Sequence, residues 1–251
     1  MSDDGYFGED VAERFDERYA DLADASVVDP IVDLLAELAD GGAALELGIG
    51  TGRIALPLAE RGVPVHGIEL SEAMVAKLRD KPAGDAIDVT IGDFSTATVE
   101  GSFAVAYLVA NTIMNVTTQE GQIAVFRNVA AQLDPGGRFV IEVLVPGLRR
   151  LPPGDTHQVF AASEAHFGVD EYDIANQGLT SHHFWVSDDR IERVSIPFRY
   201  VWPAELDLMA QLAGMRRRER WGGWRREPFT SESDRHVSVW EKPERSASPP
   251  Q

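Results

Sequence analysis

Short apolar runs alternate with segments of helical periodicity through the first 145 residues of the chain. The apolar runs, which predict buried strands, lie at 43–47, 63–68, 87–91, 103–109 and 137–145. The segments of helical periodicity lie at 29–40, 53–61, 71–79 and 118–133. Strands that are apolar on both faces and separated by helices are typical of a parallel sheet with helices on both sides. The pattern therefore predicts an α/β fold.

Two of these helices carry recognisable start signals. Asp29 stands where an N-cap is expected, with Pro30 at the first helical position, and Gly41-Gly42 ends the helix. Thr117, with Glu120 three residues later, has the pattern of a capping box. These signals predict that the two helices begin near residues 30 and 118.

The period changes to two between residues 155 and 202. His182, Phe184 and Val186 alternate with their neighbours, a polar turn follows at Asp188-Asp189, and alternation resumes from 193 to 200. Alternation around a polar turn predicts antiparallel strands, inserted after the fifth parallel strand. A helix at 203–212, a strand from 215 and a last strand at 237–240 would complete the main sheet.

The chain accordingly divides into four parts. Residues 1–150 form the N-terminal segment and the first half of the main sheet, and residues 151–202 form the insert, as a substrate cover or a dimer contact. Residues 203–244 complete the main sheet. Residues 245–251, rich in serine and proline, are expected to be disordered, like the first few residues.

Composition narrows the chemistry. The 251 residues include no cysteine, which excludes disulfides, thiolate metal sites and a cysteine nucleophile. The six histidines are scattered, without an HExxH motif, so we expect no metal site. The formal net charge of -18 disfavours a nucleic acid, because nucleic-acid affinity depends largely on lysine and arginine. Without an apolar stretch of about 18 residues or a basic N-terminus, we expect a cytoplasmic protein with no membrane contact.

A glycine run at the end of the first predicted strand is the strongest chemical signal. Residues 45–52 read Leu-Glu-Leu-Gly-Ile-Gly-Thr-Gly, and alternating glycines let a small ligand approach the backbone. A dinucleotide fingerprint would need a third glycine at the position of Arg53. This bulky residue argues against a pyrophosphate, whereas Glu69, at the end of the next strand, suits ribose hydroxyls. The run therefore indicates a nucleoside other than a dinucleotide.

Four motifs in order make the chain resemble the class I S-adenosylmethionine-dependent methyltransferases, from about Val11 to Lys242. The motifs are Glu46 with Gly48, Gly50 and Gly52; Glu69; Asp93 in Gly92-Asp93-Phe94; and the turn Leu133-Asp134-Pro135-Gly136-Gly137. The resemblance implies a Rossmann-like, mostly parallel, seven-stranded sheet and S-adenosylmethionine as cofactor. It places the cofactor against Tyr19, Glu46, Gly48, Ile49, Gly50, Arg53, Glu69, Leu70, Met74, Gly92, Asp93, Phe94 and Val109.

The resemblance also suggests roles within this set. Glu69 would accept hydrogen bonds from the ribose hydroxyls, and Asp93 would lie beside the adenine or cap its own turn. Arg53 would face the methionine carboxylate or remain a solvated residue, and Met74 would touch the adenine or belong to the core. The segment from Val11 to Tyr19 resembles a helix that folds over the cofactor.

The methyl acceptor is expected at the carboxyl ends of the fourth and fifth strands. Asn111 and Asn115 lie there, and each could orient a substrate or satisfy the backbone of its own loop. The insert resembles the sheet that closes the active site in glycine, sarcosine and sugar N-methyltransferases. Neighbouring strand residues point to opposite faces, so at most one of His182 and His183 lines the cavity.

We take His183 and Asn111 as candidate catalytic residues, although a strand histidine is more often structural. Asn115, Trp185 and Tyr200, with Arg199 as a further option, are candidate substrate-binding residues. The basic cluster at 216–226 with Trp221 and Trp224 is either a binding surface for an anionic substrate or RNA, or a strand with a solvated face.

The sequence therefore predicts a methyltransferase acting on an oxygen, nitrogen or carbon of a small molecule, such as a sugar or a secondary metabolite. Two alternatives stay open. One is a regulatory protein that binds the cofactor without turnover, and the other is a methyltransferase acting on tRNA or protein. A small-molecule acceptor and a homodimer are the expected partners.

Overall fold

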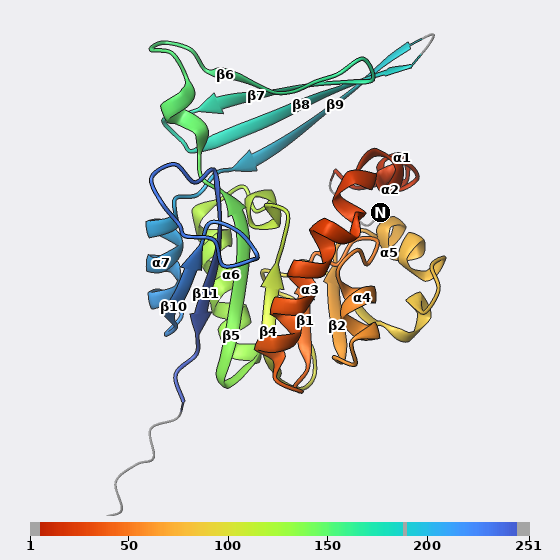
Figure 1. The fold of residues 1–251 in the computed structure, drawn as a ribbon, viewed down its shortest axis with the longest axis vertical. Helices are drawn as coiled ribbons and strands as arrows, with labels where there is room; N and C mark the ends of the chain where they lie inside the picture. The colour runs from red at the N-terminus through yellow and green to blue at the C-terminus, as the bar shows by residue number, and fades with distance from the viewer. Residues whose placement is uncertain (1–5, 188–189, 245–251) are drawn as a thin grey trace, which may run out of the picture.

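The computed structural model describes residues 6–187 and 190–244, in which a small sheet lies across one end of a larger one (Figure 1). The turn expected at Asp188-Asp189, the first few residues and the tail at 245–251 fall outside the described residues.

The larger sheet has seven strands in the order β10-β11-β5-β4-β1-β2-β3. Their bounds are β1 (Ala44–Leu47), β2 (Val65–Glu69), β3 (Asp88–Ile91), β4 (Phe103–Leu108), β5 (Leu133–Leu144), β10 (Arg216–Trp221) and β11 (Arg235–Glu241). Strands β1 to β5 are parallel, whereas β11 is antiparallel to β5 and β10 to β11. The strand order reverses between β1 and β4, so their carboxyl ends flank the place where such sheets bind ligands.

Helices cover both faces of this sheet, as the apolar strands require. They are α3 (Ala25–Ala39), α4 (Ala55–Glu60), α5 (Glu72–Arg79), α6 (Gln119–Gln132) and α7 (Pro203–Leu212), with short 3-10 turns η2 (Gly84–Ala86), η3 (Thr112–Asn115) and η4 (Gly147–Arg150). On one face α3 packs with Val105 and Val140, and on the other α6 packs with Phe139 and Trp240. None of the helices in the described part of the chain has the length and apolar character that a membrane crossing requires.

The smaller sheet is the insert that the period of two predicts. It contains β6 (His157–Ala162), β7 (His166–Asp173), β8 (Gly178–Ser187) and β9 (Arg190–Arg199), paired antiparallel in that order. Figure 1 shows it above the carboxyl ends of the main strands. One face therefore looks toward the ligand-binding end of the main sheet (Figure 1). Val186 and Ile191, which pair across β8 and β9, are exposed.

The N-terminal segment, residues 6–23, corrects one expectation. A single helix from Val11 to Tyr19 is wrong, because the chain forms α1 (Glu9–Ala12), α2 (Phe15–Arg18) and the 3-10 turn η1 (Ala20–Ala23). Arg14 and Tyr19 leave helical geometry, at φ -112° and -117°. These breaks let one short segment follow the curved boundary between α5 and the insert (Figure 1).

Two helix starts also differ from expectation. Helix α3 begins at Ala25 because Asp24, not Asp29, caps it by accepting a hydrogen bond from Ser26 N at 2.8 Å. Pro30 therefore lies inside the helix, where it cannot donate to Ser26 O, and Arg225 Nη2 donates to that oxygen instead, at 3.3 Å. Helix α6 is capped by Thr118 through Gly121 N rather than by Thr117.

Candidate active site

The glycine run forms the loop between β1 and α4. Gly48, Gly50 and Gly52 have φ of 70°, 55° and 79°, in the left-handed region that favours glycine. A Cβ on Gly48 would lie 2.8 Å from Thr112 Cγ2, and a Cβ on Gly52 would overlap Leu78. The loop therefore needs glycine for its own conformation and close packing, without any phosphate to bind.

Glu69, at the end of β2, ties this loop to the next strand. Its Oε2 accepts a hydrogen bond from Gly50 N at 2.8 Å, and its Oε1 accepts from Leu70 N and Ser71 N at 2.9 and 3.0 Å. Burial raises the pKa of Glu69, and these backbone donors oppose the rise. A carboxylate has about four acceptor positions, so this fixed group can still accept a hydrogen bond from a hydroxyl.

Glu46, on β1, is a second buried carboxyl group at the same edge. It is 3% exposed, and its Oε2 accepts a hydrogen bond from Tyr107 Oη at 3.0 Å. Burial raises the pKa of Glu46 to about 8, although the Tyr107 hydrogen bond and the charge of Arg53 oppose the rise. A cationic group brought beside Glu46 would stabilise its ionised form.

These groups line a cavity of about 180 Å³ beside the glycine loop, which we call the loop cavity. The sequence-predicted residues in its wall are Glu46, Gly48, Ile49, Gly50, Arg53, Glu69, Leu70, Met74, Phe94, Val109 and Asn115. Gly92 and Asp93 are not among its lining residues. Asp93 Oδ1 accepts a hydrogen bond from Ser95 N at 2.7 Å, which is the turn-capping role that the sequence left open.

The N-terminal segment closes the loop cavity from outside with Phe7 and Phe15. Asp16 holds it there, because its carboxylate accepts a hydrogen bond from Thr51 Oγ1 and pairs with Lys81 Nζ, both at 2.6 Å. Tyr19, expected at the cofactor, is not among the residues of the loop cavity and lines a second, larger cavity instead.

The second cavity, of about 780 Å³, lies beneath the inserted sheet, and we call it the roof cavity. Apart from Arg53, its lining falls into four groups along the chain: Tyr19, Leu22, Ser26, Val27, Pro30 and Ile31; Ala110, Asn111, Met114, Glu142 and Leu144; Phe160, Asp170, Leu179, Ser181, His183 and Phe198; and Gly222, Gly223, Trp224, Arg225, Glu227 and Arg235. Arg53 and Ala110 line both cavities, so the two spaces meet at these residues.

The junction between the cavities is held in an uncommon backbone conformation. Ala110 and Asn111 have φ of 53° and 65°, which costs non-glycine residues energy and occurs often at functional sites. Glu142 Oε2 accepts a hydrogen bond from Ala110 N at 2.9 Å, and Asn111 Oδ1 accepts one from Leu144 N at 2.8 Å. The oxygen of Asn111 thus ties its loop to the end of β5, which leaves its NH₂ group available to a ligand.

His183 and His182 point to opposite faces of the insert, as strand geometry predicts. His183 lines the roof cavity, whereas His182 lies on the other face beside Ser195 and Glu171, at 2.8 and 3.2 Å. Burial and nearby positive charge lower the pKa of His183 to about 4. His183 is therefore a neutral imidazole at physiological pH, with one ring nitrogen able to accept a proton.

The structure places Trp185 and Tyr200 outside the lining of the roof cavity, contrary to their expected contact with substrate. Trp185 packs between His166 and Arg18, and Tyr200 is buried against Tyr172. Where these two side chains lie depends on how the neighbouring strands run. The alternation of apolar and polar residues along a single strand does not show this.

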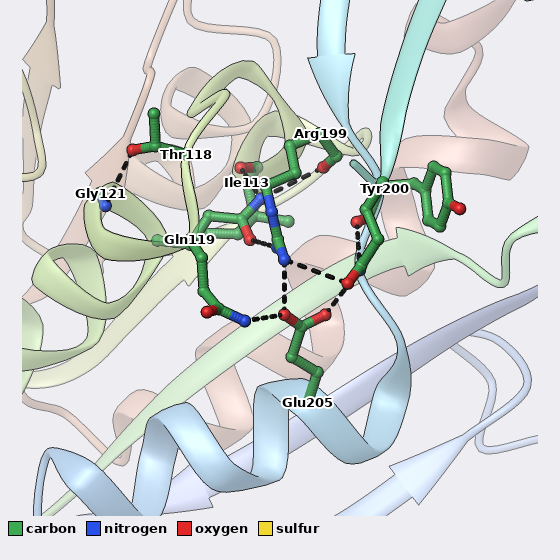
Figure 2. A network of polar contacts seen from close by, with 9 residues as sticks. Ile113, Thr118, Gln119, Gly121, Arg199, Tyr200 and Glu205 are labelled. Atoms are coloured by element: carbon green, nitrogen blue, oxygen red, sulfur yellow. Dashed lines mark hydrogen bonds and ion pairs between the residues drawn. The ribbon is translucent and has the colours of Figure 1, made fainter. Parts of the chain in front are cut away.

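Arg199, the other substrate option, belongs to a buried polar network (Figure 2). Its guanidinium pairs with Glu205 Oε1 at 2.7 Å and donates to Gln122 Oε1. Gln122 Nε2 donates to Arg199 O and to Ile113 O, which joins the end of β9 to α6 and η3. Arg199 therefore anchors the insert to the main sheet.

The basic cluster contributes to the site through its loop rather than its strand. Arg217 and Arg220 pair with Asp207, and Arg216 and Arg218 with Glu241. The following loop, 222–227, closes one side of the roof cavity. Phe160 and Asp170 also line the roof cavity, and no sequence motif singles them out. Trp224 and Arg225 belong to the basic cluster, for which a binding surface was one of the two expectations.

Comparisons with known proteins agree with this geometry. A family described as a methyltransferase domain matches residues 44–137. The structure of the CcbJ methyltransferase from Streptomyces caelestis is 34% identical and has a TM-score of 0.86, covering 96% of this chain and 99% of that chain. The cypemycin N-terminal methyltransferase from Streptomyces sp is 26% identical over 250 residues, covering 96% of this chain and all of its relative.

The chain belongs to the class I S-adenosylmethionine-dependent methyltransferases. The fold of CalS10 from Micromonospora echinaspora, described as an amino pentose methyltransferase with bound S-adenosylmethionine, is also similar, at 20% identity and a TM-score of 0.67 over 86% of this chain and 89% of that chain.

The loop cavity suits S-adenosylmethionine chemically. Glu69 would accept hydrogen bonds from ribose hydroxyls, Met74 and Phe94 would form apolar walls beside an adenine, and the buried carboxyl group of Glu46 would suit a cation. When bound, the cofactor supplies a methyl group activated by a positive sulfur. The protein then has to place an acceptor in line with that methyl group.

Proposed function

We propose that the chain transfers the methyl group of S-adenosylmethionine to an amine nitrogen of a small molecule held in the roof cavity. The observation that carries this proposal is the meeting of the two cavities at Arg53 and Ala110. A regulatory protein that only bound the cofactor would not need a second cavity opening onto the methyl end. The volume of about 780 Å³ is in the range of small-molecule sites.

Nitrogen is favoured over oxygen and carbon by the chemistry of the roof. His183, with a pKa lowered to about 4, is too weak a base to ionise a hydroxyl or a carbon acid. A neutral amine needs no such ionisation, because its lone pair is already nucleophilic. The full-length relative named for N-terminal methylation supports the same acceptor atom.

The polar groups in the wall support an acceptor with several hydrogen-bonding groups. Asp170, Ser181 and His183 extend from the insert, and Glu142 and Arg235 lie near the strand ends. Leu179 and Phe198 provide an apolar surface between them. The mixed wall suits an aminosugar or the amino end of a peptide.

Transfer of a labelled methyl group from S-adenosylmethionine to two amine probes, glucosamine and a short peptide with a free N-terminus, tests this proposal. We expect label in at least one probe and none in the N-acetylated form of either. Label in the acetylated forms would contradict an amine acceptor. Cofactor binding by calorimetry without any transfer would favour the regulatory alternative.

A further inference from the structure

A stack of side chains joins the N-terminal segment to the insert. The rings of Trp185 and His166 lie 3.9 Å apart between centroids, with 8° between their planes. The guanidinium of Arg18 lies 5.1 Å from the centre of the Trp185 ring, and Glu192 pairs with Arg18 at 2.7 Å. His166, which no sequence motif singles out, is the member of this stack that touches His183.

The two imidazoles meet edge to edge. His166 Nε2 and His183 Nδ1 are 3.0 Å apart, the ring planes differ by 6°, and the centroids are 5.1 Å apart. Rings stacked face to face would hold their atoms at about 3.5–4.0 Å, so the shorter nitrogen separation shows a hydrogen bond nearly within a common plane. The nitrogen of His183 that does not face His166 is Nε2, and His183 lines the roof cavity.

We infer that His166 is a positioning residue, which holds His183 in the tautomer whose Nε2 lone pair faces the roof cavity. This inference rests on the proposed function. In this tautomer His183 Nδ1–H donates to His166 Nε2, so the ring orientation and the proton position of His183 are fixed together. The arrangement follows the general rule that a base is oriented by a third group.

Burial, followed by nearby positive charge, keeps the pair neutral. Arg18 faces it from α2 and His182 lies on the same strand as His183, while Asp170 and Glu192 are the nearby acids on β7 and β9. Burial, followed by the charge of Arg18, lowers the pKa of His166. Burial, His166 and Arg18 lower that of His183 to about 4. A protonated His183 would lose the lone pair, so its neutrality preserves the acceptor.

An amine N–H donates to His183 Nε2, which orients the amine lone pair toward the methyl group. The nitrogen–carbon bond forms from that lone pair, and the carbon–sulfur bond breaks with its electrons on sulfur. The methylated nitrogen carries the positive charge as an ammonium hydrogen-bonded to His183 Nε2, and it gives its proton to water when the product leaves.

Three variants test the inference in the full-length protein. His166→Phe keeps a ring on Trp185 but removes both nitrogens, and His166→Gln restores a hydrogen-bond acceptor. His182→Phe is the matched control, because His182 lies on the opposite face of the same sheet. With the amine probe that the wild type methylates best, we expect His166→Phe to lower kcat by about tenfold or more, with KM changed less than about twofold.

The same comparison gives two results that would not be expected if His166 only stabilised the fold. His166→Gln should recover a large part of the lost kcat, and His182→Phe should stay within about twofold of the wild type. Unchanged kcat in His166→Phe, alongside active wild type, would overturn the inference while leaving the proposed function intact. Loss of kcat in His166→Phe that His166→Gln does not recover would also overturn it.

A spectroscopic measurement decides the tautomer without any acceptor. In ¹⁵N-labelled protein with S-adenosylhomocysteine, we expect NMR to show His183 protonated at Nδ1 and unprotonated at Nε2. His166→Phe should convert this single tautomer into a mixture, whereas His182→Phe should not. A wild-type His183 protonated at Nε2 would overturn the inference even if no probe were methylated, which separates its failure from that of the proposed function.

Discussion

The loop cavity and the roof cavity differ in how the chain builds them. Most of the loop cavity comes from residues 46–115, where successive strands end at one edge of a single sheet. The roof cavity takes its lining from four parts of the chain between Tyr19 and Arg235. Backbone groups fix the first cavity, as in the hydrogen bonds to Glu69, and side chains of a separate sheet fix the second.

The largest effect is expected from a substitution that detaches the insert from the rest of the protein. Glu205→Ala strands the buried guanidinium of Arg199, and removing one partner of a buried ion pair costs roughly 3–5 kcal/mol. We expect a clear fall in the melting temperature by calorimetry. Gln211→Ala, an exposed site on the same helix, is the control. Cofactor affinity measured well below the melting temperature should stay near that of the wild type, and a parallel loss would show that the two cavities are not independent.

The next effect sharpens the role of the backbone in the loop cavity. Glu69→Ala removes a carboxylate that accepts three backbone hydrogen bonds and lines the loop cavity. We expect S-adenosylmethionine binding to weaken by about tenfold or more in calorimetry, since hydrogen bonds to a charged group contribute about 1.5–3 kcal/mol. Exposed Glu72, on the following helix, provides the control Glu72→Ala. Equal affinities of the two variants for S-adenosylmethionine would contradict a role of Glu69 in binding the cofactor.

A pH effect distinguishes the loop cavity from the roof. Burial raises the pKa of Glu46 from 4.5 to about 8, so the folded protein without ligand holds a proton that the unfolded chain releases. The stability from this group is complete below pH 4.5 and is lost as pH rises through about 8. We expect the free energy of unfolding in urea to fall across that window in the wild type and to fall less in Glu46→Gln. Identical pH profiles would contradict a raised pKa.

The same carboxyl group should link cofactor binding to proton release. A cationic end of S-adenosylmethionine beside Glu46 favours its ionised form, so binding below about pH 8 should release a proton. Calorimetry in two buffers of different ionisation enthalpy measures that release. Glu46→Gln should show none from this group, and a proton release that survives the substitution would assign it elsewhere.

The smallest effect concerns the N-terminal segment, which contributes residues to the lining of both cavities. Arg14 and Arg18 both pair with Glu192, at 2.9 and 2.7 Å, and these pairs are partly exposed. We expect Glu192→Gln to speed release of S-adenosylmethionine about two- to fivefold in stopped-flow measurements, with the difference shrinking at high salt. The control is Glu171→Gln, because the described ion pairs of Glu171 are with His157 and His182 only. This variant should leave the rate of S-adenosylmethionine release unchanged.

Local patterns were sufficient for the main sheet and most of the loop cavity. The strands lie where apolar runs predict them, and Glu46, the glycines and Glu69 are brought together because the carboxyl ends of adjacent parallel strands share one edge. Pro30 led to a wrong prediction of where helix α3 begins. A proline is tolerated inside this helix because Arg225, 199 residues beyond Ser26, donates a hydrogen bond to the Ser26 carbonyl that Pro30 cannot reach. A contact that distant has no signature near the proline.

The chain by itself therefore determined the class of fold, the cofactor and most of the residues that line the loop cavity, since those depend on strand ends and glycine conformations encoded within short stretches. Tertiary structure decided the acceptor side. Only the packing of β7 against β8 brings His166 to His183, and only the path of the N-terminal segment moves Tyr19 to the roof cavity. Side-chain contacts between separate elements depend on how those elements pack, and the period of a single strand or helix does not contain that information.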